Sequence, residues 1–456
     1  MKKKKFILVS ALCALMSFSF VGCSDDDEPI AVVVPTVSVS EGEFADASPA
    51  EKKVSGTLVW AAPASVENVT KYVIYTSTDG KSKGTKVGEV NVGTNSFDIP
   101  EMDAPEYFLI YTANTVGEAT TGFAVRVIDH IVIKPKEYHA YYFLNSGKFG
   151  SNNASLYVYD NEKKEIIPDY FKAQNGKGLG DTAQDMIVYG SKMYIAMYGS
   201  QTIEVTDLFA KSIKQIKMEG APRGLAVDGG KVYVTSYDGY VARLDTASLE
   251  FDGKVKVGRN PEQITVSNNK LFVANSGGMD YASEIGYDKT VSVVDIPSFK
   301  EEKKIEVVVN PVSITADEQG YVYVISMGNY GDIPNTFQRI DTKDYSVSTI
   351  EGCPNATEMA YGNGKLYMFY SQWGAPAPTY ITYDTKAQKV GNSFIADGTE
   401  VKKPYKICVA GTKVFVSESD YKNNGDFYGF TASGELHKKY AVGLNPMKTV
   451  LVHTFK

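Results

Sequence analysis

Apolar and polar positions alternate along several short runs between residues 35 and 133. Alternation of this kind is typical of strands that bury one face, and no run of the segment shows a helical period. We therefore predict an all-β segment, with strands at residues 56–60, 71–76, 86–92, 107–114 and 123–128.

The order of aromatic and apolar residues in this segment resembles a fibronectin type III domain. The resemblance rests on Leu58-Val59-Trp60, then Tyr72-Val73-Ile74-Tyr75, then residues 107–114. It implies a β-sandwich over residues 35–133, in which the tryptophan is a core residue and the late tyrosine fixes a corner. Such domains usually act as spacers or docking units, and we identify no catalytic group in the segment.

A repeated pattern organises the rest of the chain. Residues 222–234 and 261–273 share a frame in which proline opens one apolar run, a polar turn follows, and a second apolar run ends the frame. The frame begins at seven anchor positions, 39 to 50 residues apart: Ala183, Pro222, Pro261, Pro311, Ala356, Pro404 and Pro446. A repeat of this size matches one propeller blade of four strands.

Five repeats contain a later alternating run that ends in an aspartate: Asp207, Asp245, Asp295, Asp341 and Asp384. The unit resembles the YVTN-type, YncE-like β-propeller repeat, and residues 271–276 and 291–295 carry the likeness best. This resemblance implies a seven-bladed β-propeller over residues 138–456. We interpret the aspartates as caps of tight turns, bonded from side chain to backbone, and not as metal ligands or catalytic groups.

The repeat region is incomplete at both ends. A single strand, residues 447–454, follows the last anchor, whereas strands at 140–144 and 155–160 precede the first one. We predict that one blade is built from both chain ends, because this closure removes the open sheet edge that a broken ring exposes.

The first 22 residues have the composition of a secretory signal peptide. Residues 2–5 are lysines, and residues 6–20 form an apolar stretch that is too short to span a bilayer comfortably. The following Val21-Gly22-Cys23 resembles the end of a bacterial lipobox, which implies that Cys23 is lipidated.

An acidic run at residues 24–28 resembles the export tag of Bacteroidetes surface lipoproteins. It implies an outer-membrane lipoprotein that faces the cell exterior, with an acidic linker over residues 23–34. The alternative interpretation is a solvated charge run in front of the fold.

Charge excludes one class of partner. Without the first 22 residues, 43 Lys and Arg stand against 54 Asp and Glu. An acidic surface repels phosphate backbones, so we exclude nucleic acid as a partner.

The cysteines and histidines show no metal-binding pattern. Cys353 and Cys408 have no CxxC partner, and the four histidines, His130, His139, His437 and His453, lack HxH or HExxH spacing. We therefore predict no metal site and no cofactor. Cys408 occupies a position where other repeats have a small residue, and we predict a buried thiol.

Loop lengths indicate which face binds a ligand. We label the strands of a blade A to D from the centre outwards; because a blade is an antiparallel meander, its B–C loops and D–A connections share one face. The B–C loops at 145–153, 275–289, 327–335, 371–378 and 418–426 are long, whereas those at 198–200 and 237–239 are short. Insertions on one face usually form the binding surface of a repeat protein.

The predicted ligand-binding residues lie on these loops, at strand ends and on the D–A connections. They are Asn145, Tyr198, Arg223, Tyr237, Asn275, Tyr281, Tyr287, Tyr330, Tyr370, Trp373, Tyr405 and Tyr421. Aromatic planes beside amide donors suit a large, flat, amide-rich or sugar-like ligand. We assign Arg223, Arg259, Tyr405 and Lys406 to the connections. The alternative is that the aromatic residues pack against one another and order the loops.

A lipid-anchored propeller of this repeat type resembles the BtuG-like, corrinoid-capturing lipoproteins of Bacteroidetes. The resemblance implies a surface protein that captures cobalamin or another corrinoid and passes it to a TonB-dependent outer-membrane transporter. A lipoprotein that captures a siderophore or haem, and a glycan-binding or adhesive protein, are the alternatives. We expect no enzyme, because the sequence shows no paired acid and base, no nucleophile with a base and no cofactor motif.

Overall fold

The computed structural model describes residues 32–129, 137–353, 355–372 and 377–455. The chain divides into two compact units, residues 1–134 and 135–456. The predicted signal peptide, Cys23, the acidic run and Trp373 lie outside the described residues. No helix in the described ranges has the length and apolar character needed to cross a membrane.

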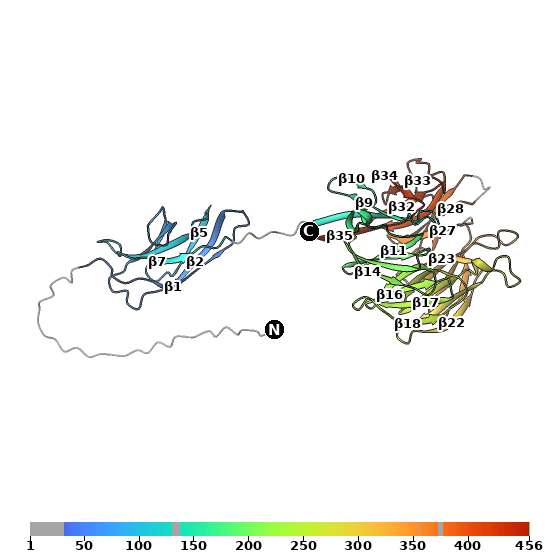
Figure 1. Ribbon diagram of the computed structural model, residues 1–456, viewed down its shortest axis with the longest axis horizontal. Coiled ribbons are helices and arrows are strands. Elements are labelled where there is room, and N and C mark those ends of the chain that lie inside the picture. The colour runs from blue at the N-terminus through green and yellow to red at the C-terminus, as the bar shows by residue number, and fades with distance from the viewer. Residues whose placement is uncertain (1–31, 130–136, 354, 373–376, 456) are drawn as a thin grey trace, which may run out of the picture. The chain divides into compact units, whose positions relative to one another are not determined.

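The first unit consists of two antiparallel sheets (Figure 1), with strand orders β1-β2-β5 and β4-β3-β6-β7. The strands are β1 Ser40–Asp46, β2 Lys53–Ala61, β3 Lys71–Ser77, β4 Lys86–Asn91, β5 Ser96–Asp103, β6 Tyr107–Ala113 and β7 Phe123–Arg126. Apolar residues of both sheets form one buried core, in which Trp60 packs edge-on against Tyr72 with ring centroids 5.3 Å apart. The five predicted strands are confirmed, and β1 and β5 are additional.

The second unit is a propeller-like arrangement of four-stranded antiparallel sheets (Figure 1). Among the described residues it has seven such sheets, six of them built from consecutive strands. The first of these six sheets contains β11 Ala183–Tyr189, β12 Lys192–Met197, β13 Thr202–Asp207 and β14 Ser212–Lys217. The second contains β15 Pro222–Asp228, β16 Lys231–Ser236, β17 Tyr240–Asp245 and β18 Phe251–Lys256. The third contains β19 Pro261–Ser267, β20 Lys270–Asn275, β21 Thr290–Asp295 and β22 Lys300–Glu306. The fourth sheet contains β23 Pro311–Ala316, β24 Tyr321–Ser326, β25 Thr336–Asp341 and β26 Val347–Thr349. The fifth contains β27 Glu358–Gly362, β28 Lys365–Tyr370, β29 Thr379–Asp384 and β30 Lys389–Val390. The sixth contains β31 Pro404–Ala410, β32 Lys413–Glu418, β33 Asn424–Phe430 and β34 Leu436–Leu444.

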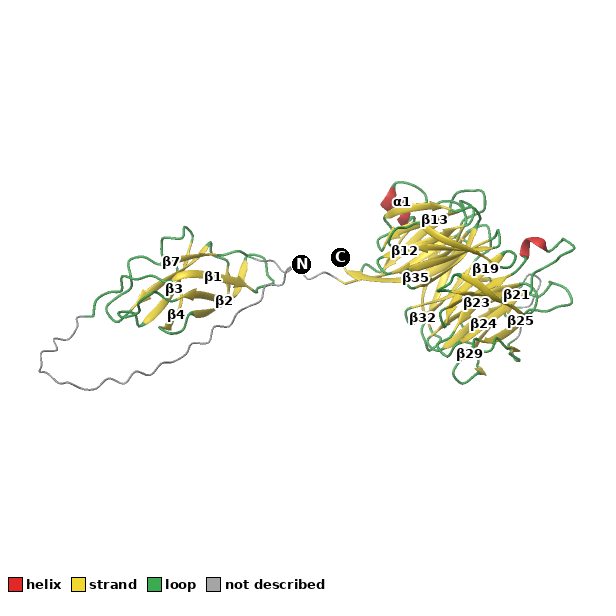
Figure 2. Cartoon of the chain, turned by 90° about the horizontal axis from the view of Figure 1, so that it is seen from below, coloured by secondary structure: helices red, strands yellow, loops and turns green. Residues whose placement is uncertain are grey.

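Both ends of the second unit contribute to the remaining sheet, which has the order β10-β9-β8-β35. Figure 2 labels its last strand, β35, near the C-terminus. Its strands are β8 Glu137–Asn145, β9 Ser155–Asp160, β10 Glu165–Ile167 and β35 Pro446–Phe455, and helix α1 Tyr170–Asn175 follows β10. The ladder between β35 and β8 runs from Pro446 opposite Asn145 to Phe455 opposite Glu137. The predicted pairing of the chain ends is confirmed.

The A strands of the seven sheets form a closed circle within the described part of the second unit. Each of β11, β15, β19, β23, β27, β31 and β35 contacts the next, and β35 contacts β11. We call these strands the inner strands.

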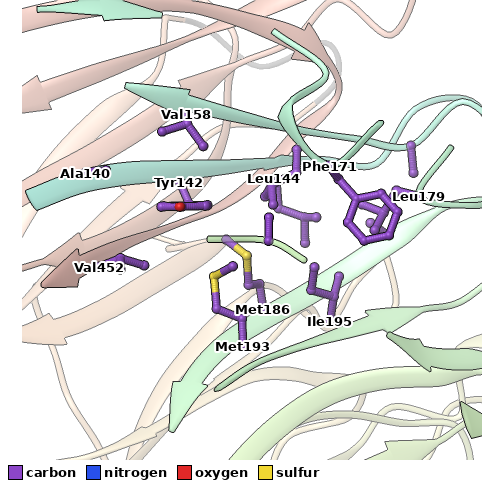
Figure 3. Packing of buried hydrophobic residues seen from close by; sticks show 14 of the residues in the cluster. Ala140, Tyr142, Leu144, Val158, Phe171, Leu179, Met186, Met193, Ile195 and Val452 are labelled. Carbon is purple, nitrogen blue, oxygen red and sulfur yellow. The ribbon is translucent and has the colours of Figure 1, made fainter. Parts of the chain in front are cut away.

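Apolar side chains fill the spaces between neighbouring sheets. Figure 3 shows one cluster, in which Tyr142 and Leu144 of β8 lie beside Met186, Met193 and Ile195 of β11 and β12. All five are fully buried. Burial of one large apolar side chain stabilises a fold by about 1.5–3 kcal/mol, so packing between sheets holds the circle together.

The recurring aspartates close tight turns, and this prediction is confirmed. The Oδ1 atom of Asp207 accepts hydrogen bonds from the backbone N–H groups of Phe209 and Lys211, at 2.9 and 2.8 Å. Similar bonds from backbone N–H groups reach Asp245, Asp295, Asp341 and Asp384. The predicted burial of the Cys408 thiol is confirmed as well.

Candidate ligand-binding site

The inner strands surround a cavity of about 540 Å³. Each inner strand begins at its repeat anchor or just after it, so the residues that follow the anchors face the same central space. Its polar lining includes Gln184 and Asp185 of β11, Arg223 of β15, Glu262 and Gln263 of β19, Glu358 of β27, Tyr405 and Lys406 of β31, and Lys448 of β35.

The charged side chains of the described lining form three ion pairs. The pairs are Arg223 with Glu262, Lys406 with Glu358, and Lys448 with Asp185. The Nε atom of Arg223 lies 2.8 Å from Oε2 of Glu262, and Nζ of Lys448 lies 3.2 Å from Oδ1 of Asp185. Cations and carboxylates balance one another, so this lining carries no net formal charge.

Pairing keeps the cavity cations protonated. Burial, the largest single effect, lowers the pKa of the Lys406 ammonium, but Glu358 and Tyr405 together raise it above its ordinary value. Burial and Glu262 compete in the same way at Arg223, whose pKa is also raised. Each cavity carboxylate is therefore paired with a positively charged side chain.

Two predicted tyrosines surround Arg223. The guanidinium carbon lies 4.7 Å from the ring centroid of Tyr237 and 5.5 Å from that of Tyr198. The Tyr237 hydroxyl donates a hydrogen bond to Glu262, and the Arg223 Nη1 group donates to Oε1 of Gln184 at 2.7 Å. Because the guanidinium is held by a carboxylate, an amide and two aromatic rings, it forms a fixed wall of the site.

Other predicted tyrosines line the cavity directly. Tyr405 and Tyr421 meet edge to face with ring centroids 5.4 Å apart, and both contribute to the lining. Tyr330 also lines the cavity and contacts Tyr287, with ring centroids 6.2 Å apart. Tyr421 is 66% exposed and Tyr330 is exposed too, so these rings have free surface for a ligand.

The loop at residues 276–289 is held in place by Arg259. The Arg259 Nη1 group lies 2.5 Å from Oδ2 of Asp280 and donates to the Gly286 carbonyl at 2.9 Å. Tyr281, at the end of the short 3-10 helix Gly278–Asp280, is 69% exposed. Arg259 therefore orders the loop, and Tyr281 is its accessible aromatic side chain.

The B–C loops and the D–A connections share one face, as predicted. The backbone N–H of Ser276 donates to the Asn260 carbonyl at 3.3 Å, and that of Met327 donates to the Asn310 carbonyl at 2.8 Å. We call this side the loop face. The loop predicted at 418–426 is shorter in the structure, because β32 ends at Glu418 and β33 begins at Asn424.

Two predicted donors are corrected by the structure. Asn145 and Asn275 are fully buried. Asn145 Oδ1 accepts a hydrogen bond from the Gly443 N–H at 3.0 Å, and Asn275 Nδ2 donates to Ser292 Oγ at 2.9 Å. Their amides therefore join strands and are not available to a ligand.

The structure also corrects the location of four other predicted residues. Arg223, Tyr405 and Lys406, which we assigned to D–A connections, belong to the inner strands β15 and β31. Tyr370 ends β28 with its hydroxyl 3.4 Å from Oε1 of Gln372, apart from the described lining. The structure thus brings Arg223, Tyr330, Tyr405 and Tyr421 to one cavity.

Three residues of the cavity lining were not predicted: Gln184, Asp185 and Lys448. All three lie one or two positions after a repeat anchor, as Arg223 and Lys406 do. An alignment of those two positions across the repeats is the signal that identifies the lining.

The fold and the cavity define an all-β, propeller-like protein with a polar central site. A protein-family model described as "Domain of unknown function (DUF5074)" matches residues 139–431, and the chain belongs to this family. A search of curated proteins found no match.

Solved structures with distant similarity include a hydrazine synthase chain of Kuenenia stuttgartiensis, with 15% identity over 58% of this chain and 93% of that chain, at a TM-score of 0.47. The computationally designed Ika8 protein has 12% identity over 67% of this chain and 88% of that one, at a TM-score of 0.46. A chain of the nidogen/laminin complex has 12% identity over 58% and 97%, at a TM-score of 0.39.

Proposed function

We propose that this chain is a binding protein without enzymatic turnover, and that it captures cobalamin or another corrinoid on the loop face. The observation that carries the proposal is a charge-balanced polar cavity with exposed tyrosine rings at its edge. A corrinoid combines a broad ring with many peripheral amides, so tyrosine planes and fixed polar groups suit it. The resemblance to BtuG-like lipoproteins supports the same class of ligand.

Charge balance separates this ligand from the anionic alternatives, haem and siderophores. Haem carries propionates, and many ferric siderophores are strongly anionic. A site for either ligand therefore needs cationic side chains that are not already paired with a carboxylate. Arg223, Lys406 and Lys448 each already have a carboxylate partner. A neutral, amide-rich ligand meets no electrostatic penalty in such a lining.

We also propose a finer description of the fold. The second unit is a seven-bladed β-propeller of YVTN type, supported by the closed circle of inner strands and the shared sheet formed by β8 and β35. The first unit is a fibronectin type III-like module, supported by its two sheet orders and by the buried Trp60.

We further propose that lipidated Cys23 anchors the protein to the outer membrane, facing the cell exterior, where it delivers its ligand to a TonB-dependent transporter. Replacement of Cys23 by alanine should release the protein from washed membranes. Retention of the variant there contradicts the lipid anchor.

Titration calorimetry of the purified chain with cyanocobalamin, a ferric siderophore and haem, each separately, tests the choice of ligand. We expect measurable affinity for cyanocobalamin alone. Mass spectrometry of the recovered cobalamin should show an unmodified molecule, and a cleaved or altered product contradicts binding without turnover.

Loop-face variants test the place of binding. Tyr421→Ala and Tyr281→Ala should each weaken cyanocobalamin binding by about 1–3 kcal/mol, because a few aromatic contacts carry most of the energy of an interface. Phe455→Ala is the matched control: it is 60% exposed, and it ends β35 about 30 Å along the strand from Pro446. Equal affinity in all three variants shows that these tyrosines only order the loops.

A further inference from the structure

We infer that Glu137, His139 and His453 form a binding site for one divalent transition-metal ion, which links the two ends of the second unit. The histidines are far apart in the sequence, so their spacing gave no sign of a metal site. The structure brings them together because β8 pairs with β35.

Strand register places the three side chains on one face of this pair. His453 lies directly opposite His139 in the ladder. Glu137 lies two positions before His139, and alternate residues of a strand project from the same face. Opposite residues of an antiparallel pair have Cβ atoms about 4.5–5.5 Å apart, which is close enough for one ion to bridge their side chains.

The donor atoms already lie near the separation that zinc requires. Glu137 Oε1 is 2.6 Å from Nε2 of His453 and 3.3 Å from Nε2 of His139. One donor atom from each residue lies within 4.8 Å of the other two. In a tetrahedral site with Zn–N distances of about 2.0–2.1 Å, neighbouring donors are roughly 3.4 Å apart, so small side-chain rotations suffice.

The donor set selects the class of ion. Two imidazoles with one carboxylate suit zinc and its neighbours, whereas calcium and magnesium prefer oxygen ligands alone. The side chains of His139, His453 and Glu137 are all about half exposed, so an ion reaches them from solvent. Three protein ligands leave a fourth position for water or for a group from another molecule.

An ion bound at this site would stabilise the pairing of β8 with β35, which closes the circle of sheets. Glu137 and His139 belong to the first strand of the second unit, and His453 belongs to its last strand. In the unfolded chain His453 is far from Glu137 and His139, so the folded state binds the ion more tightly, and the ion stabilises that state. The bound ion therefore connects β8 to β35.

Zinc titration of the metal-free, full-length chain without a histidine tag tests this inference. We expect one zinc ion per chain by calorimetry and a rise in melting temperature with zinc. His139→Gln and His453→Gln should each weaken zinc binding about tenfold or more and remove most of the rise. Glutamine keeps a polar side chain of similar length, and the melting temperature of each metal-free variant shows whether it folds.

His437→Gln is the matched control, because His437 is exposed on β34 and is not part of the cluster. It should keep the zinc affinity and the thermal shift of the parent. Cobalt gives a second readout: the strong visible bands of four- or five-coordinate Co²⁺ should appear with the parent and with His437→Gln, and disappear with His453→Gln. Absence of zinc binding by the parent, or equal binding by all variants, overturns the site.

Discussion

Tyr233 of β16 is 1% exposed and packs against Phe299 with ring centroids 5.9 Å apart, whereas Tyr281 on the loop face is 69% exposed. Burial therefore separates two uses of the same residue type. A buried ring holds neighbouring sheets together, and an exposed one is available to a ligand.

Tyr233→Ala should lower the free energy of unfolding by about 3–5 kcal/mol, as for other large aromatic residues truncated in a packed core. Tyr281→Ala should change it by less than about 0.5 kcal/mol, as is usual for surface substitutions. Denaturant titration of both variants measures the difference. Similar stabilities for the two variants contradict the assignment of Tyr233 to the core.

The buried asparagines show where residue-level prediction failed. Gly443 approaches Asn145 and Gly258 approaches Asn275 so closely that a Cβ on either glycine would lie within 3.0 Å of the asparagine side chain. Both glycine N–H groups donate to the amide oxygen of the adjacent asparagine. An asparagine at a strand end looks like a surface donor in the sequence, because its glycine partner lies on another strand or connection.

At the scale of elements, strands with buried side chains were predicted more readily than strands with exposed ones. The B strands carried the repeat most clearly because their side chains are largely buried between sheets, as in β12 and β20. Strand β1, with the sequence SEGEFAD, and the outer strand β22, with KEEKKIE, have mostly exposed or half-exposed side chains and little apolar pattern. A strand that covers an edge needs few apolar residues, so periodicity does not reveal it.

The register between two strands is a second feature that periodicity does not reveal. The cluster of Glu137, His139 and His453 depends on the register between β8 and β35. The sequence predicted that these strands pair, but not which residues are opposite. A shift of one residue moves every side chain to the other face.

Deletion of residues 446–456 should destabilise the whole second unit. Strand β35 covers the open edge of β8 along its length and supplies Lys448, the ion-pair partner of Asp185. Its loss exposes a sheet edge beside the cavity and leaves the circle of inner strands incomplete. Thermal melting followed by circular dichroism should show a large fall in melting temperature, and an unchanged melting curve contradicts closure by both ends.

At the scale of the whole molecule, buried tyrosines set the response to alkaline pH. Burial raises the pKa of Tyr138 and of Tyr194 to about 12, compared with about 10 for a tyrosine in an unfolded chain. Between these values the unfolded state releases its protons first, so the stabilising contribution is complete below pH about 10 and is lost as pH rises toward about 12.

Melting temperatures measured across this pH range should therefore fall steadily above pH about 10. Tyr194→Phe removes one titrating hydroxyl and should make the fall less steep, with little change at neutral pH. A melting temperature that stays constant through the whole range contradicts the role of the buried tyrosines.

The two units should fold independently. The core of the first unit is a cluster of residues from its own two sheets, such as Leu58 and Phe108, whereas the described clusters of the second unit draw on its own strands. Compact units with separate cores unfold separately unless a large interface couples them. Removal of residues 23–130 should leave a second unit with the melting temperature that its transition has in the full chain. Calorimetry of both proteins measures this: if the shortened chain melts earlier by several degrees or fails to fold, the first unit stabilises the second, and its role goes beyond that of a spacer.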